Sequence, residues 1–273
     1  MDFKVVGKDV PRPDAVAKAT GKAMFLDDLQ LPGMLYAAVL RPEHAHARIL
    51  SIDTREAERA EGVVAVVTGS DDQPRYGDNI RDLLAMASGK VRHIGEAVAA
   101  VVAESPHQAK QALKGIRVAY EPLPVYVDAR DAMAEDAVLI HEENGSFQTL
   151  PGLKPVPGTN IANVYTLKKG NVEAGFAEAE VVVEGEFNYP FGSSAALEPH
   201  GAIAWFHEDR TIEIWSSSIC PFIVRDEIAH GYGRPSSDVR VHIPEVGGCF
   251  GYKSDLTIEH TVAAFEDSGI LAW

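Results

Sequence analysis

The stretch EAVAAVVAESPHQAKQALKGIRVAYEP (96–122) contains a strand, a helix and a second strand in close succession. Its apolar run at 97–103 is typical of a strand that is buried on both faces. Ser105 is a favoured helix N-cap residue and Pro106 suits the first turn, which predicts a helix through Leu113. The residues at 116–128 then predict a strand that ends among prolines. The stretch therefore favours an α/β fold.

The preceding residues repeat the same order of elements. Residues 35–42 have the composition of a strand, and the polar, alanine-rich residues 54–62 predict a helix with Gly62 at its C-terminal cap. The β-branched run at 63–69 predicts another strand buried on both faces. We therefore expect one α/β domain over residues 1–128.

Residues 129–163 differ in composition from this domain. Gly, Pro, Asn and Thr cluster in NGSFQTLPGLKPVPGTN (144–160), which disfavours both helix and strand interiors. We expect a surface linker here, followed by a second domain over 164–273. In that domain the pattern predicts these elements in order: a helix at 171–180, a strand at 181–189, a hairpin of 201–206 and 211–218, a helix at 221–233, a strand at 239–246 and a helix at 254–269.

Composition excludes several classes of partner. The 273 residues include 25 Lys and Arg against 40 Asp and Glu, a net charge of −15. Such a surface repels nucleic acid and anionic membranes, so we expect neither as a partner. The sequence has no 18-residue apolar run and no secretory signal, which favours a cytoplasmic protein. Its two cysteines, Cys220 and Cys249, are too few for a disulfide framework or an iron-sulfur cluster.

A glycine cluster, EVGGCFGYKSD (245–255), lies between the predicted strand at 239–246 and the predicted helix at 254–269. Glycine lets another molecule approach the main chain, and a following helix presents free backbone N–H groups, so an anion or a metal-oxo oxygen is one possible ligand. A bulge or turn is the alternative. The cluster matches neither GxGxxG nor GxxxxGK[ST].

Several of these segments together resemble one family. VGGCFGYK (246–253) resembles the GGGFGGK-type segment in the large, molybdopterin-binding subunit of molybdenum hydroxylases, the xanthine dehydrogenase, aldehyde oxidase and carbon monoxide dehydrogenase group. Residues 14–53 and 91–124 resemble the opening and close of that family's α/β hammerhead domain. Residues 168–187, 196–205 and 215–228 resemble the start of its molybdenum-cofactor domain. The resemblance implies the N-terminal portion of such a subunit, with a hammerhead domain at 1–128, the linker at 129–163 and an incomplete cofactor domain at 164–273.

The resemblance also implies a cofactor site. It places Gly247, Gly248, Cys249, Phe250 and Gly251 against a molybdenum-bearing molybdopterin, either plain or as the cytosine dinucleotide. Cys249 replaces the family's third glycine, and a positive φ at a residue with a Cβ is strained, so we expect an altered loop. Residues outside this chain are expected to complete the site.

Other positions depart from the family pattern. Ile219 in WSSSICP stands where relatives often carry a glutamine that contacts the metal's oxygen ligands, and Ser254 stands where xanthine-type enzymes carry a glutamate, which puts purine specificity in doubt. The family's general-base glutamate is expected outside this chain, so no catalytic residue is assigned within it. His200, which lies close to Glu198, is expected to be structural.

The implied function is therefore that of a partial subunit. It would oxidise an aldehyde or N-heterocycle with water-derived oxygen, together with a second molybdopterin-domain chain, an iron-sulfur subunit carrying two-iron clusters and an FAD subunit, and it would be inactive alone. The alternative is a non-catalytic binding or assembly protein, or a truncated remnant, that retains the fold.

Overall fold

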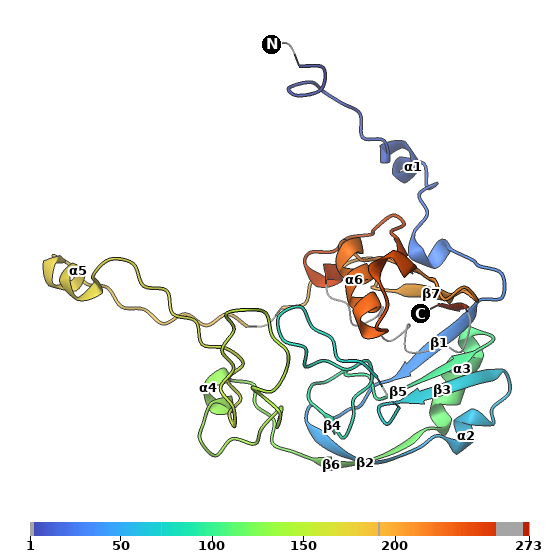
Figure 1. Cartoon of the computed structure of the whole chain (residues 1–273), viewed down its shortest axis with the longest axis horizontal. Helices are drawn as coiled ribbons and strands as arrows, with labels where there is room; N and C mark the ends of the chain where they lie inside the picture. Colours follow the sequence, from blue (N-terminus) through green and yellow to red (C-terminus); the bar gives the residue numbers. More distant parts are fainter. Residues whose placement is uncertain (1–2, 72, 191, 255–269, 273) are drawn as a thin grey trace.

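The computed structural model of the chain describes residues 3–71, 73–190, 192–254 and 270–272. Two sheets form its body, and two segments extend from that body (Figure 1). One sheet has seven strands in the order β3-β5-β1-β10-β7-β8-β9, and the other has three in the order β4-β2-β6. The bounds in the larger sheet are β1 Leu35–Leu40, β3 Val63–Thr68, β5 Ala99–Ala103, β7 Ala202–Phe206, β8 Ile212–Ser216, β9 Val239–His242 and β10 Ile270–Ala272. Those in the smaller sheet are β2 Ala47–Asp53, β4 Lys90–Val91 and β6 Arg117–Pro122.

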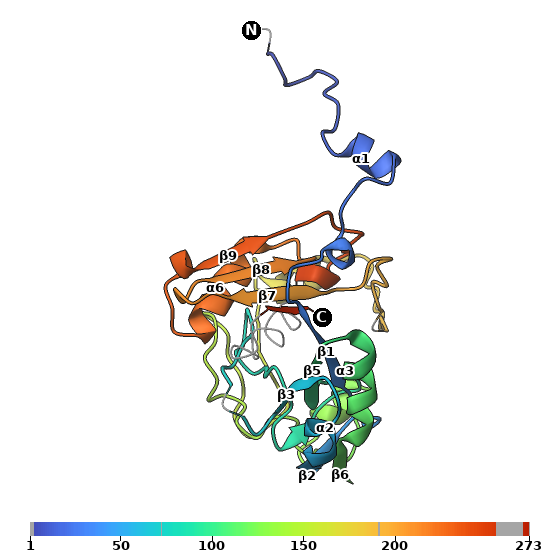
Figure 2. The same cartoon turned by 90° about the vertical axis from the view of Figure 1, so that its right-hand side faces the viewer.

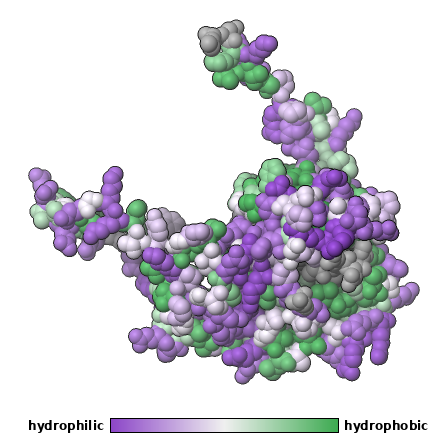
Figure 3. Space-filling view, viewed as in Figure 1, coloured by the Kyte–Doolittle hydropathy of each residue, from purple (hydrophilic) through white to green (hydrophobic). Residues whose placement is uncertain are grey.

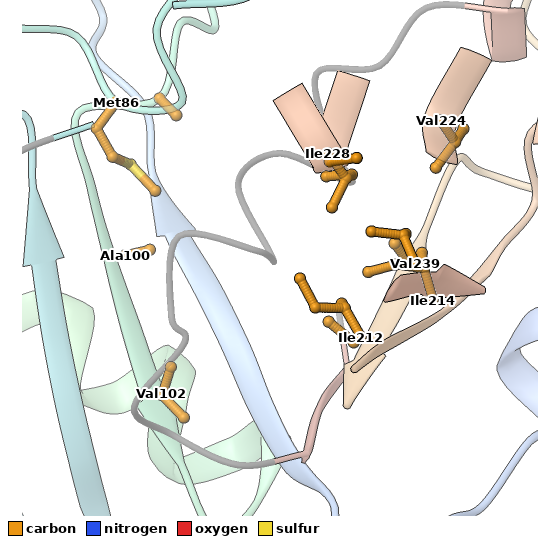
Figure 4. Packing of buried hydrophobic residues seen from close by; sticks show 12 residues of the cluster. Met86, Ala100, Val102, Ile212, Ile214, Val224, Ile228 and Val239 are labelled. Carbon is orange, nitrogen blue, oxygen red and sulfur yellow. The ribbon is translucent and has the colours of Figure 1, made fainter. Parts of the chain in front are cut away.

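Strand β5 is buried along its whole length, as its apolar sequence predicts. Its residues alternate between two cores because successive side chains of a strand point to opposite faces. Ala99 and Val101 pack with buried residues of α2 and α3, whereas Ala100 and Val102 pack in a core with β7, β8 and α6 (Figure 4). A strand with two buried faces needs no polar positions, which accounts for the continuous apolar run.

Most of the predicted helices begin at or next to the predicted residue. Ser105 caps α3 (Pro106–Ala112) by accepting a hydrogen bond from the Gln108 N–H, with Pro106 in the first turn. The others are α1 Ala15–Ala19, α2 Arg55–Glu58, α4 Ala129–Ala132, α5 Val172–Glu178 and α6 Pro221–Gly231. Single 3-10 turns lie at η1 Leu26–Asp28, η2 Leu113–Gly115, η3 Ser236–Asp238 and η4 Tyr252–Ser254. Apart from Ser254, which lies in η4, the predicted helix at 254–269 falls outside the described residues.

Strand β10 joins the two halves of the chain in one sheet. It pairs in parallel with β1, where Leu35 lies opposite Leu271, and antiparallel with β7, where Ile203 lies opposite Ala272. Figure 2 shows β7, β8 and β9 on one side of this junction and β1, β5 and β3 on the other. The core behind the sheet is also continuous, since Met86 and Val102 belong to the same buried cluster as Ile214 and Ile228.

The irregular segment after β6 is held by side-chain hydrogen bonds. Asn144 Nδ2 donates to the carbonyl oxygens of Val156, Thr159 and Ile161, at 3.1, 2.8 and 3.0 Å. Asp128 caps the one short helix of this segment, α4. These bonds satisfy backbone groups that neither helix nor sheet pairs, so the segment keeps a defined path without regular structure.

Two element predictions are corrected by the structure. Residues 181–189 are not a strand: they are exposed and have no regular structure, because the described residues offer no neighbouring strand to pair with them. Strand β3 lies at the sheet edge, so it is only partly buried, and Val64 is 52% exposed. In the described parts of the chain, no helix has the length and apolarity needed to cross a bilayer.

Truncation of Ile214 tests the continuous core. Ile214 is fully buried, so Ile214→Ala should lower the free energy of unfolding by about 2–5 kcal/mol, because it removes buried contacts and leaves a cavity. Urea denaturation followed by circular dichroism measures the change. The exposed Val64→Ala is the control and should shift stability by no more than about 0.5 kcal/mol. Equal effects of the two substitutions would contradict the assigned core.

Candidate functional site

The glycine cluster forms a loop between β9 and the turn η4. The N-terminal segment contacts its start: the Glu245 N–H donates to the Met24 carbonyl at 3.0 Å, and Lys18 forms an ion pair with Glu245 at 2.8 Å. Burial lowers the pKa of Arg41, which lies at the end of β1, and the charge interaction with Tyr252 of the loop opposes that effect. Residues from the N-terminal part of the chain therefore lie beside this loop.

The backbone of the loop needs glycine at some positions and tolerates a side chain at others. Gly248 and Gly251 have φ values of +100° and +90°. Phe250 also has a positive φ, +53°, which is unusual for a residue with a side chain and costs roughly 1–2 kcal/mol. Cys249 is not among the residues with positive φ, so the strain expected there falls on Phe250 instead.

A buried ion pair fixes the loop from within. The Lys253 side chain is fully buried, and its Nζ lies 2.5 Å from Glu198 Oε2. The same oxygen accepts the Gly247 N–H at 2.7 Å, while the Glu198 N–H donates to the Gly247 carbonyl at 3.2 Å. A Cβ on Gly247 would lie 2.5 Å from the Cβ of Glu198, so only glycine permits this approach. Glu198 thus holds both ends of the loop.

A third segment, 217–220, packs against the end of the loop. The Lys253 carbonyl accepts hydrogen bonds from Ser218 Oγ at 2.9 Å and from the Ile219 N–H at 3.2 Å. Ser218 Oγ also accepts the Cys220 N–H at 3.0 Å. The structure therefore brings Ile219 beside the glycine loop, although the two are distant in sequence.

Several backbone N–H groups of the loop donate no hydrogen bond to a described residue. Among the described residues, none accepts a hydrogen bond from the backbone N–H of Gly248, Cys249, Phe250 or Gly251. The Gly247 N–H, in contrast, is taken by Glu198. Space beside Gly251 is open, and the Phe250 ring is 77% exposed. The loop therefore presents a row of donors and one aromatic face to an acceptor-rich ligand.

The other candidate residues, His200 and the two cysteines, contact neighbouring side chains or backbone groups or are free thiols. His200 is nearly buried and lies edge-on to Tyr252, with ring centroids 5.8 Å apart. Cys249 Sγ accepts the Lys253 N–H at 3.3 Å, and both cysteines are free thiols. Within the ranges that the structure describes, no group of three or more His, Cys, Asp or Glu side chains is placed to bind a metal ion.

Sequence reasoning missed the Glu198–Lys253 pair. The two residues lie far apart in sequence, and neither carries a pattern that predicts burial of a charge. The available signal was local: Lys253 follows a run of glycines and an aromatic residue, and Glu198 stands in the otherwise uncharged segment AALEPHGAIAW (195–205). Charged residues are rarely buried unless paired, so the pair becomes evident only from the fold.

Known proteins share both halves of the chain. Residues 20–124 match the family model "aldehyde oxidase and xanthine dehydrogenase, a/b hammerhead domain", and residues 154–266 match "molybdopterin cofactor-binding domain". The second match begins inside the segment predicted as a linker.

Individual relatives agree with these matches. The chain is 32% identical to the nicotinate dehydrogenase large molybdopterin subunit of Eubacterium barkeri, over 94% of this chain and 58% of that protein. It is 35% identical to the putative xanthine dehydrogenase molybdenum-binding subunit of Escherichia coli, over 93% of this chain and 33% of that protein. A CO dehydrogenase structure from Oligotropha carboxidovorans superposes with a TM-score of 0.83 at 30% identity, over 98% of this chain and 34% of that chain.

Removal of the Lys253 charge tests the buried pair. Lys253→Met leaves the Glu198 carboxylate buried without its counter-ion, which should cost about 3–5 kcal/mol of stability. Thermal and urea denaturation measure the loss, and exposed Lys169→Met is the matched control. Adding Glu198→Gln to Lys253→Met should recover part of the loss, since the buried group is then neutral. A Lys253→Met protein as stable as the control would contradict the pairing.

Proposed function

The chain belongs to the molybdenum hydroxylase large-subunit family of xanthine dehydrogenase, aldehyde oxidase and CO dehydrogenase, and we propose that it supplies one side of a molybdopterin site. It covers only 58% and 33% of the two relatives described above, so the reaction of a whole enzyme is part of this proposal. The reaction we propose is oxidation of an aldehyde or N-heterocycle with oxygen from water. The observation that carries the proposal is that four backbone N–H groups, on a loop held from inside by Glu198, donate to no acceptor in the part of the chain that the structure describes.

The loop residues fit such a ligand. Backbone N–H groups of Gly248, Cys249, Phe250 and Gly251 would hold oxygen acceptors of molybdopterin, in its plain or cytosine dinucleotide form, and the exposed Phe250 ring would pack beside it. Gly247 has a different role, because its N–H is used by Glu198 and its missing Cβ admits that side chain. When bound, the molybdenum cofactor supplies the oxygen-transfer chemistry and accepts the electrons of the substrate.

Substrate choice and acid-base chemistry depend on residues near and beyond this loop. Ile219 is 51% exposed beside the loop and offers an apolar contact where a glutamine would offer an amide. Ser254 lacks the carboxylate that purine recognition would use. We propose that a glutamate outside this chain acts as general base, so the chain alone is inactive.

Partner chains are part of the same proposal. The sequence has two cysteines, whereas an iron-sulfur cluster usually takes four thiolates, so two-iron clusters and FAD would belong to other subunits. A second molybdopterin-domain segment would close the cofactor site. Both described relatives are themselves named as subunits, which supports this arrangement. The cytoplasm is the proposed location.

A non-catalytic binding or assembly protein is the second candidate. Ile219 and Cys249 favour it, because both depart from the residues that working relatives often carry at these positions. The two candidates differ in turnover. A complex that retains molybdopterin and oxidises neither aldehydes nor N-heterocycles would support the binding protein, whereas turnover would exclude it.

Cofactor retention tests the loop directly. The chain is co-expressed with its partner subunits, and molybdenum and released pterin are measured in the purified complex. Gly248→Val should reduce both at least tenfold, since a Cβ at φ +100° is strained and lies 3.1 Å from the Phe250 ring. Gly158→Val is the matched control, because Gly158 also has a positive φ, +72°, but lies in open space far from the loop. Stoichiometric molybdenum in the chain without partners would contradict a shared site.

An apolar surface beside the loop predicts association. Ile219, Phe222 and Phe250 are 51%, 70% and 77% exposed, and apolar side chains that the folded chain leaves exposed favour association with another surface. Light scattering should therefore detect self-association of the isolated chain. Ile219→Ser with Phe222→Ser should reduce it severalfold, and co-expressed partners should abolish it. A monodisperse monomer at high concentration would contradict an unpartnered surface here.

A further inference from the structure

Residues 164–190 form an arm that leaves the body of the protein, with α5 at its far end (Figure 1). Every residue of the arm is exposed. Its return leg touches the body through an ion pair between Glu186 and Arg130 of α4. Figure 3 shows hydrophobic and hydrophilic residues interspersed along the arm.

The return leg has the sequence of a one-sided strand. In VVVEGEFNY (181–189) the odd positions are apolar except for Gly185, and most even positions are polar. The side chains on the apolar side, Val181, Val183, Phe187 and Tyr189, are 78%, 87%, 81% and 88% exposed. Such alternation is typical of a strand with one buried face. In this structure that face is uncovered.

The backbone of this leg also lacks a partner. No strand is assigned to 181–190, and the described residues place no paired strand beside it. An isolated extended segment is not stable in water, because neither its backbone groups nor its apolar side chains gain from the conformation. The sequence of this leg therefore has the pattern of a strand, and the described residues supply no neighbour for it.

The charge of the arm indicates the chemistry of that neighbour. Residues 171–190 contain five glutamates and no lysine or arginine. Glu184 lies within the alternating segment, on the side opposite the apolar residues, and no described cation pairs with it. A partner edge with Lys or Arg beside an apolar inner face would complement both sides of the leg.

Comparison with a longer chain indicates where that edge is found. The CO dehydrogenase chain superposes on 98% of this chain, so it includes the arm, yet only 34% of its own length is used. Most of that longer chain is therefore available to cover the corresponding segment.

We propose that residues 181–189 dock as an edge strand on a β-sheet of the remaining part of the molybdopterin-binding subunit. This inference rests on the proposed function, since that function requires the second segment. Val181, Val183, Phe187 and Tyr189 pack into the partner's apolar face, and Glu184 faces its basic residues. Main-chain hydrogen bonds supply most of the affinity, as in other cases of strand addition.

Hydrogen exchange of the full chain tests the docking. The chain is measured alone and in the complex formed by co-expression with its own partner subunits, in both cases without molybdopterin. At least every second amide of 181–189 should exchange tenfold or more slowly in the complex, because alternate N–H groups of an edge strand pair with the neighbour. The amides of 164–170 should not change.

Two pairs of variants give the controls. The N–H groups of Val182 and Val183 point to opposite sides of a strand, so Val182→Pro combined with Val183→Pro removes a ladder donor in either register and should weaken the complex at least tenfold, whereas Leu167→Pro, in the outgoing leg of the arm, should not. Glu184→Lys should weaken it several-fold, and Glu173→Lys in α5 should have little effect. Failure to form a complex, or equal binding by the unaltered chain and the variant with both Val182→Pro and Val183→Pro, would overturn the proposal. Concentration-dependent protection of 181–189 in the chain alone would assign the strand to a second copy, which also overturns it.

The docking result is independent of the cofactor result. A complex that protects 181–189 but retains no molybdopterin when partners and cofactor are supplied leaves the docking intact and contradicts the proposed function. Retention of the cofactor without protection of 181–189 leaves the proposed function intact and contradicts the docking.

Discussion

Lysine is almost never fully buried in a protein unless an opposite charge pairs with it, and this constraint organises the site. Lys253 is fully buried and meets Glu198 at 2.5 Å, so the segments that carry these two residues must stay together. The Glu198 carboxylate also accepts a hydrogen bond from the Gly247 N–H. The Lys253 carbonyl accepts hydrogen bonds from Ser218 Oγ and the Ile219 N–H. One pair thus aligns three segments that are far apart in sequence.

In the first half, β3, β5 and α3 were predictable because their signals are local, whereas β2 and β4 of the smaller sheet were not predicted. The run at 97–103 is apolar throughout, and β5 is buried on both faces as that run predicts. Ser105 and Pro106 define the start of α3 within a few residues. The strand predicted at 181–189 is absent. Alternation of apolar and polar residues indicates that a segment can form a strand, but the strand also needs a neighbour, and the described residues contain none for it.

The sequence predicted where the candidate site lies in the chain but not what each of its residues does. The glycines mark where the main chain is approached closely, but their separate roles come from the fold. Gly247 admits Glu198, whereas Gly248 and Gly251 take positive φ values. The strain expected at Cys249 falls on Phe250, since the turn places the left-handed residue one position later. The local signals around Glu198 and Lys253 do not identify the two residues as partners, because they are too far apart in sequence.

The insertion of β10 between β1 and β7 has a consequence for the order of folding. Leu35 pairs with Leu271, so the contact that closes the sheet joins the two most distant strands of the chain. Contacts of such long range form late, and a nascent chain would have completed β1, β5 and β3 long before β10 is synthesised. Until then one edge of β1 has unpaired backbone groups, which is the situation that molecular chaperones protect from aggregation. During synthesis, the first half of the chain therefore has an unpaired edge at β1 until β10 has been made.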